Sequence, residues 1–298
     1  QRATPAPYVR QRFVMLPLLA TAMRALPGPQ APQQVSFRTR EDMWDALNEL
    51  NFTSGVEIGV ERGITSSLTL RRWKTCSLYV LVDAWAYNAG GNTSTLDHYA
   101  ASGHSQASHN SKLQTAMAQP IVRGGCRGSF IKALKVPQCG VQLQICRNSS
   151  HICPRRFADE TFDYIFVDAL HDRKAVLRDL RVWWPKLKFG GIMAGDDYLN
   201  ATDFARRAHG DAATAEHVRS VVEHHRYARN YDGTIDTRGG FTKGAVDDFF
   251  ACKVTSEDDV PLQPDDEAAC PHHRVPTVFL NTADRTFHSM PDTWAVRK

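Results

Sequence analysis

Short runs of β-branched and aromatic residues alternate with helical patterns along most of this 298-residue chain, and that alternation limits the possible folds more than any other feature. Five runs are typical of strands, and they cover residues 55–60, 78–83, 141–145, 162–168 and 191–194. Apolar residues at helical spacing predict helices over residues 64–73 and 173–187. A further helix is predicted after Thr39, because Asp42 follows it as in a capping box. We therefore expect an α/β fold, doubly wound around a mostly parallel sheet.

The chain divides into an arm and one domain. Residues 1–35 are rich in proline and are predicted to form an N-terminal arm, whereas residues 36–298 are predicted to form a single domain. Two stretches interrupt the alternation of strands and helices, at residues 84–140 and 209–240. The first is expected to hold one irregular helix and a flexible loop, and the second is polar and rich in histidine. Long loops at the rim of an α/β sheet commonly carry substrate specificity.

Bulk composition excludes some classes of protein. The net charge is +4 with a pI near 8.7, and the basic residues form no stripe interleaved with aromatic residues, so nucleic acid is not an expected partner. No apolar run reaches the ~18 residues of a membrane span. The nearest, residues 13–26, contains Pro17 and Arg24, and is either an amphipathic segment, the remnant of a removed signal or anchor, or a surface arm. Because the chain begins with Gln1, we expect a segment upstream of it.

Cysteines and glycosylation sequons favour the secretory pathway, in the Golgi or ER lumen, over the cytoplasm or an organelle. Seven cysteines without a C-x-x-C pair argue against a zinc cluster, and a disulfide between Cys252 and Cys270 would suit an oxidising compartment. Four sequons predict a glycoprotein, and they begin at Asn51, Asn92, Asn148 and Asn200. The last two lie next to predicted active-site positions, where a glycan would obstruct, so both locations stay open.

A glycine turn joins the first predicted strand to the following helix. Gly59 and Gly63 would let the backbone approach a ligand, and the helix start would supply N–H donors. The spacing is G-x-x-x-G, not the G-x-G-x-x-G of dinucleotide-binding proteins, which argues against a nucleotide-dependent oxidoreductase. Asp83 ends the second strand, about twenty residues further on, where a carboxylate can accept both hydroxyls of a ribose. Taken alone, Asp83 could also be an exposed residue at a strand end.

Acidic residues end two further predicted strands. Asp168 and His171 follow one strand, and Asp196 and Asp197 follow the next. The carboxyl ends of neighbouring parallel strands meet above the crevice where ligands bind, so three carboxylates and a histidine are predicted to converge. Like charges at that separation require a cation, and a hard divalent ion such as Mg²⁺ fits oxygen ligands. The alternative is that Asp196 and Asp197 only cap the helix that begins near Asn200.

Four segments together resemble class I S-adenosylmethionine-dependent methyltransferases: residues 57–63, 81–85, 162–171 and 187–198. More narrowly, they are similar to the branch that includes the macrocin-type sugar O-methyltransferases. The resemblance covers residues 50–250 and is strongest over 55–90 and 160–200. It implies a Rossmann-like, doubly wound, mostly parallel seven-stranded sheet with an antiparallel last strand.

The resemblance also implies S-adenosylmethionine as the cofactor. Its contacts would come from Glu57, Gly59, Gly63, Asp83, Asn148 and Ser149. The first three would bracket the methionine part, Asp83 would hold the ribose, and the last two would lie against the adenine together with Arg147.

A divalent metal and a general base follow from the same resemblance. Asp168, Asp196 and Asp197 would chelate a divalent ion, expected to be Mg²⁺, and His171 would be the base, with Asp168 counted beside it as catalytic. Coordination to a cation lowers the pKa of a hydroxyl, and a nearby imidazole can take its proton. The alternative is that His171 only orients Asp168 through a hydrogen bond. Several relatives carry His-Asp in place of the Asp196–Asp197 pair, so metal affinity could differ here.

The sequence therefore predicts an S-adenosylmethionine-dependent, metal-assisted O-methyltransferase that acts on a sugar or another small hydroxyl acceptor. The alternative is a catalytically silent methyltransferase-like domain that serves as a structural or interaction subunit. The proline-rich arm and the insertions would suit such docking into an oligomer or assembly. Every expected cofactor and metal position holds a competent residue, which favours the enzyme.

Overall fold

The structure is a computed structural model that describes residues 37–85, 106–254, 274–279 and 293–298. The predicted arm, the sequon at Asn92 and the partner predicted for Cys252, Cys270, lie outside the described residues. The boundaries of the predicted domain therefore stay a prediction.

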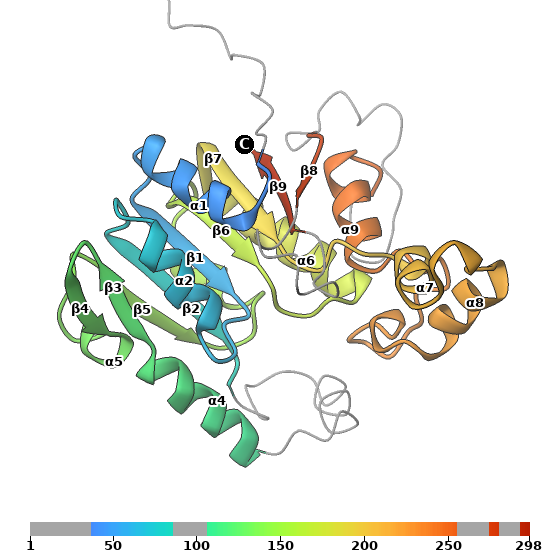
Figure 1. Cartoon of the computed structure of the whole chain (residues 1–298), viewed down its shortest axis with the longest axis horizontal. Helices are drawn as coiled ribbons and strands as arrows, with labels where there is room; N and C mark the ends of the chain where they lie inside the picture. The colour runs from blue at the N-terminus through green and yellow to red at the C-terminus, as the bar shows by residue number, and fades with distance from the viewer. Residues whose placement is uncertain (1–36, 86–105, 255–273, 280–292) are drawn as a thin grey trace, which may run out of the picture. The chain divides into compact units, whose positions relative to one another are not determined.

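A seven-stranded sheet forms the centre of the described fold (Figure 1). Its strands are, in spatial order, β5 (Gln142–Arg147), β2 (Leu78–Asp83), β1 (Ser54–Ile58), β6 (Phe162–Val167), β7 (Leu187–Gly195), β9 (Thr293–Arg297) and β8 (Thr277–Phe279). The pairs from β5 to β7 are all parallel, whereas β9 runs antiparallel to both of its neighbours. The predicted Rossmann-like α/β fold with an antiparallel last strand is confirmed. The order reverses at β1, so the carboxyl ends of β1, β2 and β6 meet where such folds bind ligands.

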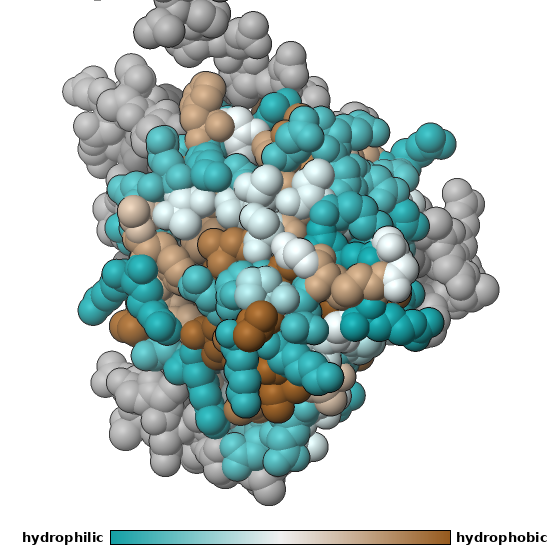
Figure 2. Space-filling view, turned by 90° about the vertical axis from the view of Figure 1, so that its left-hand side faces the viewer, coloured by the Kyte–Doolittle hydropathy of each residue, from teal (hydrophilic) through white to brown (hydrophobic). Residues whose placement is uncertain are grey.

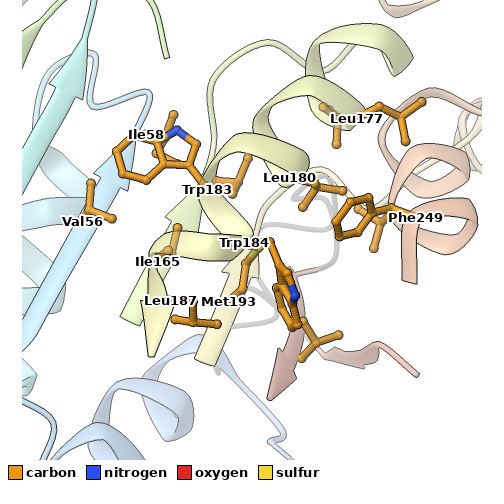
Figure 3. Close-up of a cluster of buried hydrophobic side chains, with 14 of the residues drawn as sticks. Val56, Ile58, Ile165, Leu177, Leu180, Trp183, Trp184, Leu187, Met193 and Phe249 are labelled. Atoms are coloured by element: carbon orange, nitrogen blue, oxygen red, sulfur yellow. The ribbon is translucent and has the colours of Figure 1, made fainter. Parts of the chain in front are cut away.

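Helices cover both faces of the sheet (Figure 1). One face packs against α6 (Arg173–Trp183) and α9 (Phe241–Phe250). The close-up in Figure 3 shows Ile58 of β1 beside Trp183 of α6, and Phe249 of α9 beside Leu180 of α6. The other face packs against α1 (Arg40–Glu49) and α2 (Ile64–Arg72). Because side chains alternate along a strand, β1 directs Val56 and Ile58 to the first face and Glu57 to the second.

Side-chain caps fix where several helices begin. Thr39 caps α1 by accepting a hydrogen bond from the backbone N–H of Asp42 at 3.1 Å. Asp42 Oδ2 in turn accepts a hydrogen bond from the N–H of Arg38, one residue before the one that a full capping box would use. Asp172 caps α6 by accepting from Ala175.

The first insertion is more regular than the sequence suggested. It contains α4 (Gln106–Ala118), a hairpin of β3 (Pro120–Arg123) and β4 (Cys126–Ser129), and the short α5 (Phe130–Ala133). A disulfide joins Cys126, the first residue of β4, to Cys139 in the segment between α5 and β5. A second disulfide joins Cys146 to Cys153, which opens the 3₁₀ turn η1 (Cys153–Arg156).

The second predicted insertion, residues 209–240, begins at the end of α7 (Ala201–His209), the helix that follows β7. It contains the turn η3 (Gly210–Ala212), α8 (Ala215–His224) and the turn η4 (Arg226–Ala228), and α8 forms a helical hairpin with α7. A small apolar cluster around Ala201, Ala228 and Phe241 holds it to the start of α9. A further turn, η2 (Trp184–Lys186), joins α6 to β7.

The surface in Figure 2 is mainly hydrophilic, with scattered apolar side chains. Four large apolar side chains of α2 and of the region around α5 are exposed: Ile64, Leu68, Ile131 and Val136. Within the described parts of the chain, no helix is both long and apolar enough to span a membrane.

Candidate active site

The turn between β1 and α2 depends on its two glycines for reasons of backbone geometry. Gly59 has φ +91°, and a Cβ added there would lie 1.9 Å from the carbonyl oxygen of Asp168. Gly63 has φ +71°, and an added Cβ would press on Gln119 and Ala116 of the α4 region at 3.2–3.3 Å. Both glycines are therefore required by the chain's own packing, and the positions carry no separate signal for a ligand.

Glu57 is buried beneath this turn. Its Oε2 accepts hydrogen bonds from the hydroxyls of Ser66 at 2.8 Å and Tyr79 at 3.0 Å. Burial raises the pKa of Glu57 to about 7, although these two hydrogen bonds and the charge of Arg40 oppose the shift. Glu57 thus lies behind the turn, tied to α2 and β2.

Asp83 holds the ends of β1 and β2 together. One carboxylate oxygen accepts from the N–H of Glu61 at 2.7 Å and the other from the N–H of Trp85 at 2.8 Å. The indole N–H of Trp85 donates in turn to the carbonyl of Glu61 at 2.7 Å. Burial raises the pKa of Asp83, and the two backbone hydrogen bonds oppose it. Each oxygen still has a second lone pair, so the carboxylate could accept a ribose hydroxyl as well.

Asn148 and Ser149 follow β5 beside Asp83. Arg147 pairs with Asp83 in the parallel register, and its guanidinium donates to the carbonyl of Trp85 at 2.7 Å. The side-chain oxygen of Asn148 accepts from the N–H of Ser149 at 2.8 Å. The structure therefore brings the predicted ribose and adenine residues to adjacent strand ends.

The three predicted metal ligands lie at the ends of β6 and β7. The N–H of Asp168 donates to Ile58, and that of Asp196 donates to Val167, which fixes both backbones to neighbouring strands. Asp197 has φ +55°, an uncommon conformation for a residue other than glycine. Burial raises the pKa of Asp168 well above its usual range; the charges of Asp196 and Asp197 raise it further, and Arg40 opposes them.

His171 faces the carboxylates, and its closest partner is Asp197. Its Nε2 lies 3.2 Å from Asp197 Oδ2 and 3.9 Å from Asp168 Oδ1. The hypothesis that His171 only orients Asp168 therefore has little geometric support. Burial lowers the pKa of His171 despite the opposing charges of Asp197 and Asp196, which favours a neutral imidazole near pH 7.

Tyr227 completes this cluster from the second insertion. Its hydroxyl donates to Asp197 Oδ2 at 2.7 Å, and its ring lies 4.9 Å from that of His171. Burial and the charge of Asp197 raise the pKa of Tyr227, so the hydroxyl stays protonated and remains a donor.

The interpretation of Asp196 and Asp197 as helix caps is wrong. Asn200 caps α7: its side chain accepts from the N–H of Asp203, and the carboxylate of Asp203 accepts from the N–H of Asn200. Asp196 instead forms an ion pair with Arg40, whose guanidinium lies 2.7 Å from its Oδ2.

The carboxylate oxygens of the predicted metal site do not form a donor set that fits a divalent ion. Asp196 Oδ2 is already paired with the guanidinium of Arg40. Asp197 Oδ2 already contacts His171 and accepts a hydrogen bond from Tyr227. Asp196 Oδ1 is buried without a hydrogen-bond partner, but it is a single oxygen. Among the residues that the structure describes, no group of three or more His, Cys, Asp or Glu side chains is placed to hold a metal ion.

Sequence reasoning missed Arg40 and Tyr227. Arg40 did carry a signal, because a basic residue in the first turn of a helix opposes the helix dipole and suggests an acidic partner elsewhere. Tyr227 carried none, since it stands in a polar, irregular stretch with no periodic pattern.

Comparison with known proteins agrees with the fold. Residues 56–198 match the sequence model of a protein family described as a methyltransferase domain. The match runs from β1 to just beyond the Asp196–Asp197 pair, so it includes the glycine turn, Asp83 and His171. The match covers slightly less than half of the chain, and the fold of this part is Rossmann-like. Comparison with curated proteins gives no match.

Solved structures with a related fold are remote in sequence. An O-methyltransferase from Bacillus cereus in complex with SAH is 13% identical, with a TM-score of 0.38, over 90% of this chain and 84% of that one. The N-methyltransferase NodS from Bradyrhizobium japonicum is 11% identical, with a TM-score of 0.37, over 87% and 94%. The methyltransferase domain of a bacterial Hen1 is 11% identical, with a TM-score of 0.41, over 85% and 94%. These similarities are too remote to carry an argument about substrate.

Proposed function

We propose that the chain is an S-adenosylmethionine-dependent O-methyltransferase. One observation carries the proposal: within a methyltransferase domain, the imidazole of His171 lies 3.2 Å from Asp197 at the end of β7, beside the strand ends that hold the predicted cofactor residues. A carboxylate next to an imidazole orients the ring and stabilises the positive charge that it gains as a base.

His171 would act as the base in this reaction. S-Adenosylmethionine would supply a methyl group on a positively charged sulfur, and the acceptor oxygen forms a C–O bond with it as the C–S bond breaks. The hydroxyl proton passes to His171, and Asp197 and Tyr227 keep the ring in place. The sequence resemblance supports a sugar or another small hydroxyl compound as the acceptor. Metal assistance is left out of the proposal, because the donor set does not fit a metal ion.

The test is a titration with S-adenosylmethionine followed by an assay of S-adenosylhomocysteine release on a panel of sugars and small phenols. Asp83→Asn should weaken cofactor binding about tenfold, and His171→Gln should lower kcat about a hundredfold while sparing cofactor affinity. Asp45→Asn and His224→Gln, on exposed helical surface, are the matched controls. A wild-type chain that does not bind the cofactor would favour the silent structural subunit instead.

We also propose that the protein works in an oxidising compartment and carries a glycan at Asn51. Two disulfides in the described residues support the compartment. Asn51 is exposed, whereas the amide oxygens of Asn148 and Asn200 accept hydrogen bonds from the backbone. Glycosidase treatment of protein made in a secretory host should lower the mass of the wild type more than that of Asn51→Gln. Equal mass losses would contradict the assignment.

A further inference from the structure

Arg40 lies where the sequence predicted a metal ion. It is the first residue of α1, and its guanidinium lies 2.7 Å from Asp196 Oδ2, at the end of β7. The side chains are only 10% and 16% exposed. A buried ion pair of this length is a fixed part of the site, because separating it would leave an uncompensated charge away from water.

Three elements other than α1 hold the guanidinium in place. The hydroxyl of Thr293 in β9 accepts hydrogen bonds from Arg40 Nε at 3.3 Å and from Arg40 Nη2 at 3.1 Å. The ring of Phe166 in β6 lies beneath it, 5.0 Å from the guanidinium carbon to the ring centroid. Together with Asp196 after β7, these contacts fix the orientation of a planar cation.

The positive charge of Arg40 interacts electrostatically with more than one carboxylate. Burial alone would lower its pKa, but the charges of Asp196 and Asp168 raise it above the ordinary value, so the side chain stays cationic. Arg40 also opposes the burial that raises the pKa values of Asp168 and Glu57. One guanidinium therefore offsets part of the negative charge of the acidic cluster that seemed to require a divalent ion.

A metal ion bound to Asp196 would either lie beside this guanidinium or displace it. Asp196 Oδ2 is already paired, and Asp197 Oδ2 already contacts His171 and Tyr227. Binding of Mg²⁺ would place a second cation beside a buried guanidinium, or would expel that guanidinium from its hydrogen bonds to Thr293. Both arrangements disfavour the metal.

We propose that Arg40 is a built-in cation that takes the place of the divalent metal, so that methyl transfer by this site is independent of metal. The inference rests on the proposed function, and Arg40 is a positioning residue that acts through Asp196 and Asp168. It keeps the acids at the ends of β6 and β7 in place and leaves the chemistry to His171.

The first experiment measures metal directly on the wild-type chain. Calorimetric titration with Mg²⁺ and with Mn²⁺, each alone, should show no stoichiometric binding, and methyl transfer should continue at the same rate in excess chelator. Stoichiometric binding, or a rate lost in chelator and restored by Mg²⁺, overturns the inference. If the wild type fails to bind S-adenosylmethionine, the proposed function fails, and the metal titration still decides whether Arg40 excludes the ion.

The second experiment removes the cation. Arg40→Met should lower kcat roughly a hundredfold with unchanged cofactor affinity, and should create Mg²⁺ binding that restores part of the rate. Arg40→Lys should keep most of the rate, which guards against a variant that fails to fold. Arg72→Met is the matched control, since Arg72 pairs with Asp45 at the same 2.7 Å on exposed surface. An Arg40→Met variant that folds, keeps the wild-type rate and binds no Mg²⁺ contradicts the proposal.

Discussion

The site has two halves that are built differently. In the β1–β2 tip (residues 59–63 and 83–85), the carboxylate of Asp83 is held by backbone N–H groups of Glu61 and Trp85, which lie within or next to one strand–helix–strand unit. In the β6–β7 tip (residues 168–171 and 196–197), the carboxylates are held by the side chains of Arg40 and Tyr227, which come from α1 and from the second insertion. The first half is therefore a local structure, whereas the second exists only when distant elements pack together.

This difference explains what the sequence could predict. The glycine turn and Asp83 follow from a short motif, because a strand, a turn and a helix place them without help from the rest of the chain. The meeting of Asp168 with Asp196 and Asp197 also follows, from the adjacency of parallel strand ends. The identity of their cation does not, since it depends on how α1 docks against the sheet. No periodic pattern places Arg40 beside Asp196.

The largest expected effect tests the point where the two halves touch. Gly59→Ala would place a Cβ 1.9 Å from the carbonyl of Asp168, in a backbone conformation of φ +91°. We expect a loss of more than about 4 kcal/mol in the free energy of unfolding, or no folding at all. Gly190→Ala is the control: φ is +79° with nothing within 4 Å of an added Cβ, so the cost should be about 1–2 kcal/mol. Equal losses in denaturant unfolding would show that the two tips do not constrain each other.

The next largest expected effect is on the pH dependence of stability, and it comes from Glu57, which is buried beneath the β1–β2 tip. Its pKa rises on folding from 4.5 to about 7, so the folded state keeps a proton that the unfolded state loses between these values. Stability should therefore fall as pH rises through that window, by up to about 3 kcal/mol. Glu57→Gln should remove this pH dependence in unfolding experiments, while Glu49→Gln at an exposed position should retain it. A curve for Glu57→Gln that parallels the wild type would contradict the buried, protonated carboxyl.

The disulfide between Cys146 and Cys153 provides a further test of the β1–β2 tip, because Cys146 lies in β5, whose end pairs with the end of β2 at Asp83. It closes a short loop with a sequence separation of 7, and both residues are buried. Replacing both cysteines with alanine should lower the free energy of unfolding by about 2 kcal/mol. Cofactor affinity should fall more than in the matched double alanine variant of Cys126 and Cys139, a disulfide that joins β4 to the segment after α5. A larger loss of cofactor affinity in the Cys126 and Cys139 variant would show that the end of β5 does not support the β1–β2 tip.

The smallest expected effect tests the β6–β7 tip. Tyr227→Phe removes the hydroxyl that donates to Asp197 and should cost about 1 kcal/mol of stability. It should also lower kcat, because His171 loses a neighbour that fixes its carboxylate partner. Tyr198→Phe removes a comparable hydroxyl, one that donates to Asp247, and should cost similar stability without the loss in kcat. Identical kinetics for the two variants would place Tyr227 outside the site.

The hairpin of α7 and α8 leaves the sheet at Asn200, three residues after Asp197, and brings Tyr227 back to that same aspartate. Sequence changes in this excursion can therefore alter the immediate surroundings of Asp197 and His171 while every strand keeps its partners. Under the proposed function, this one segment would set the surroundings of the acceptor, while the residues predicted to hold the cofactor lie on other elements.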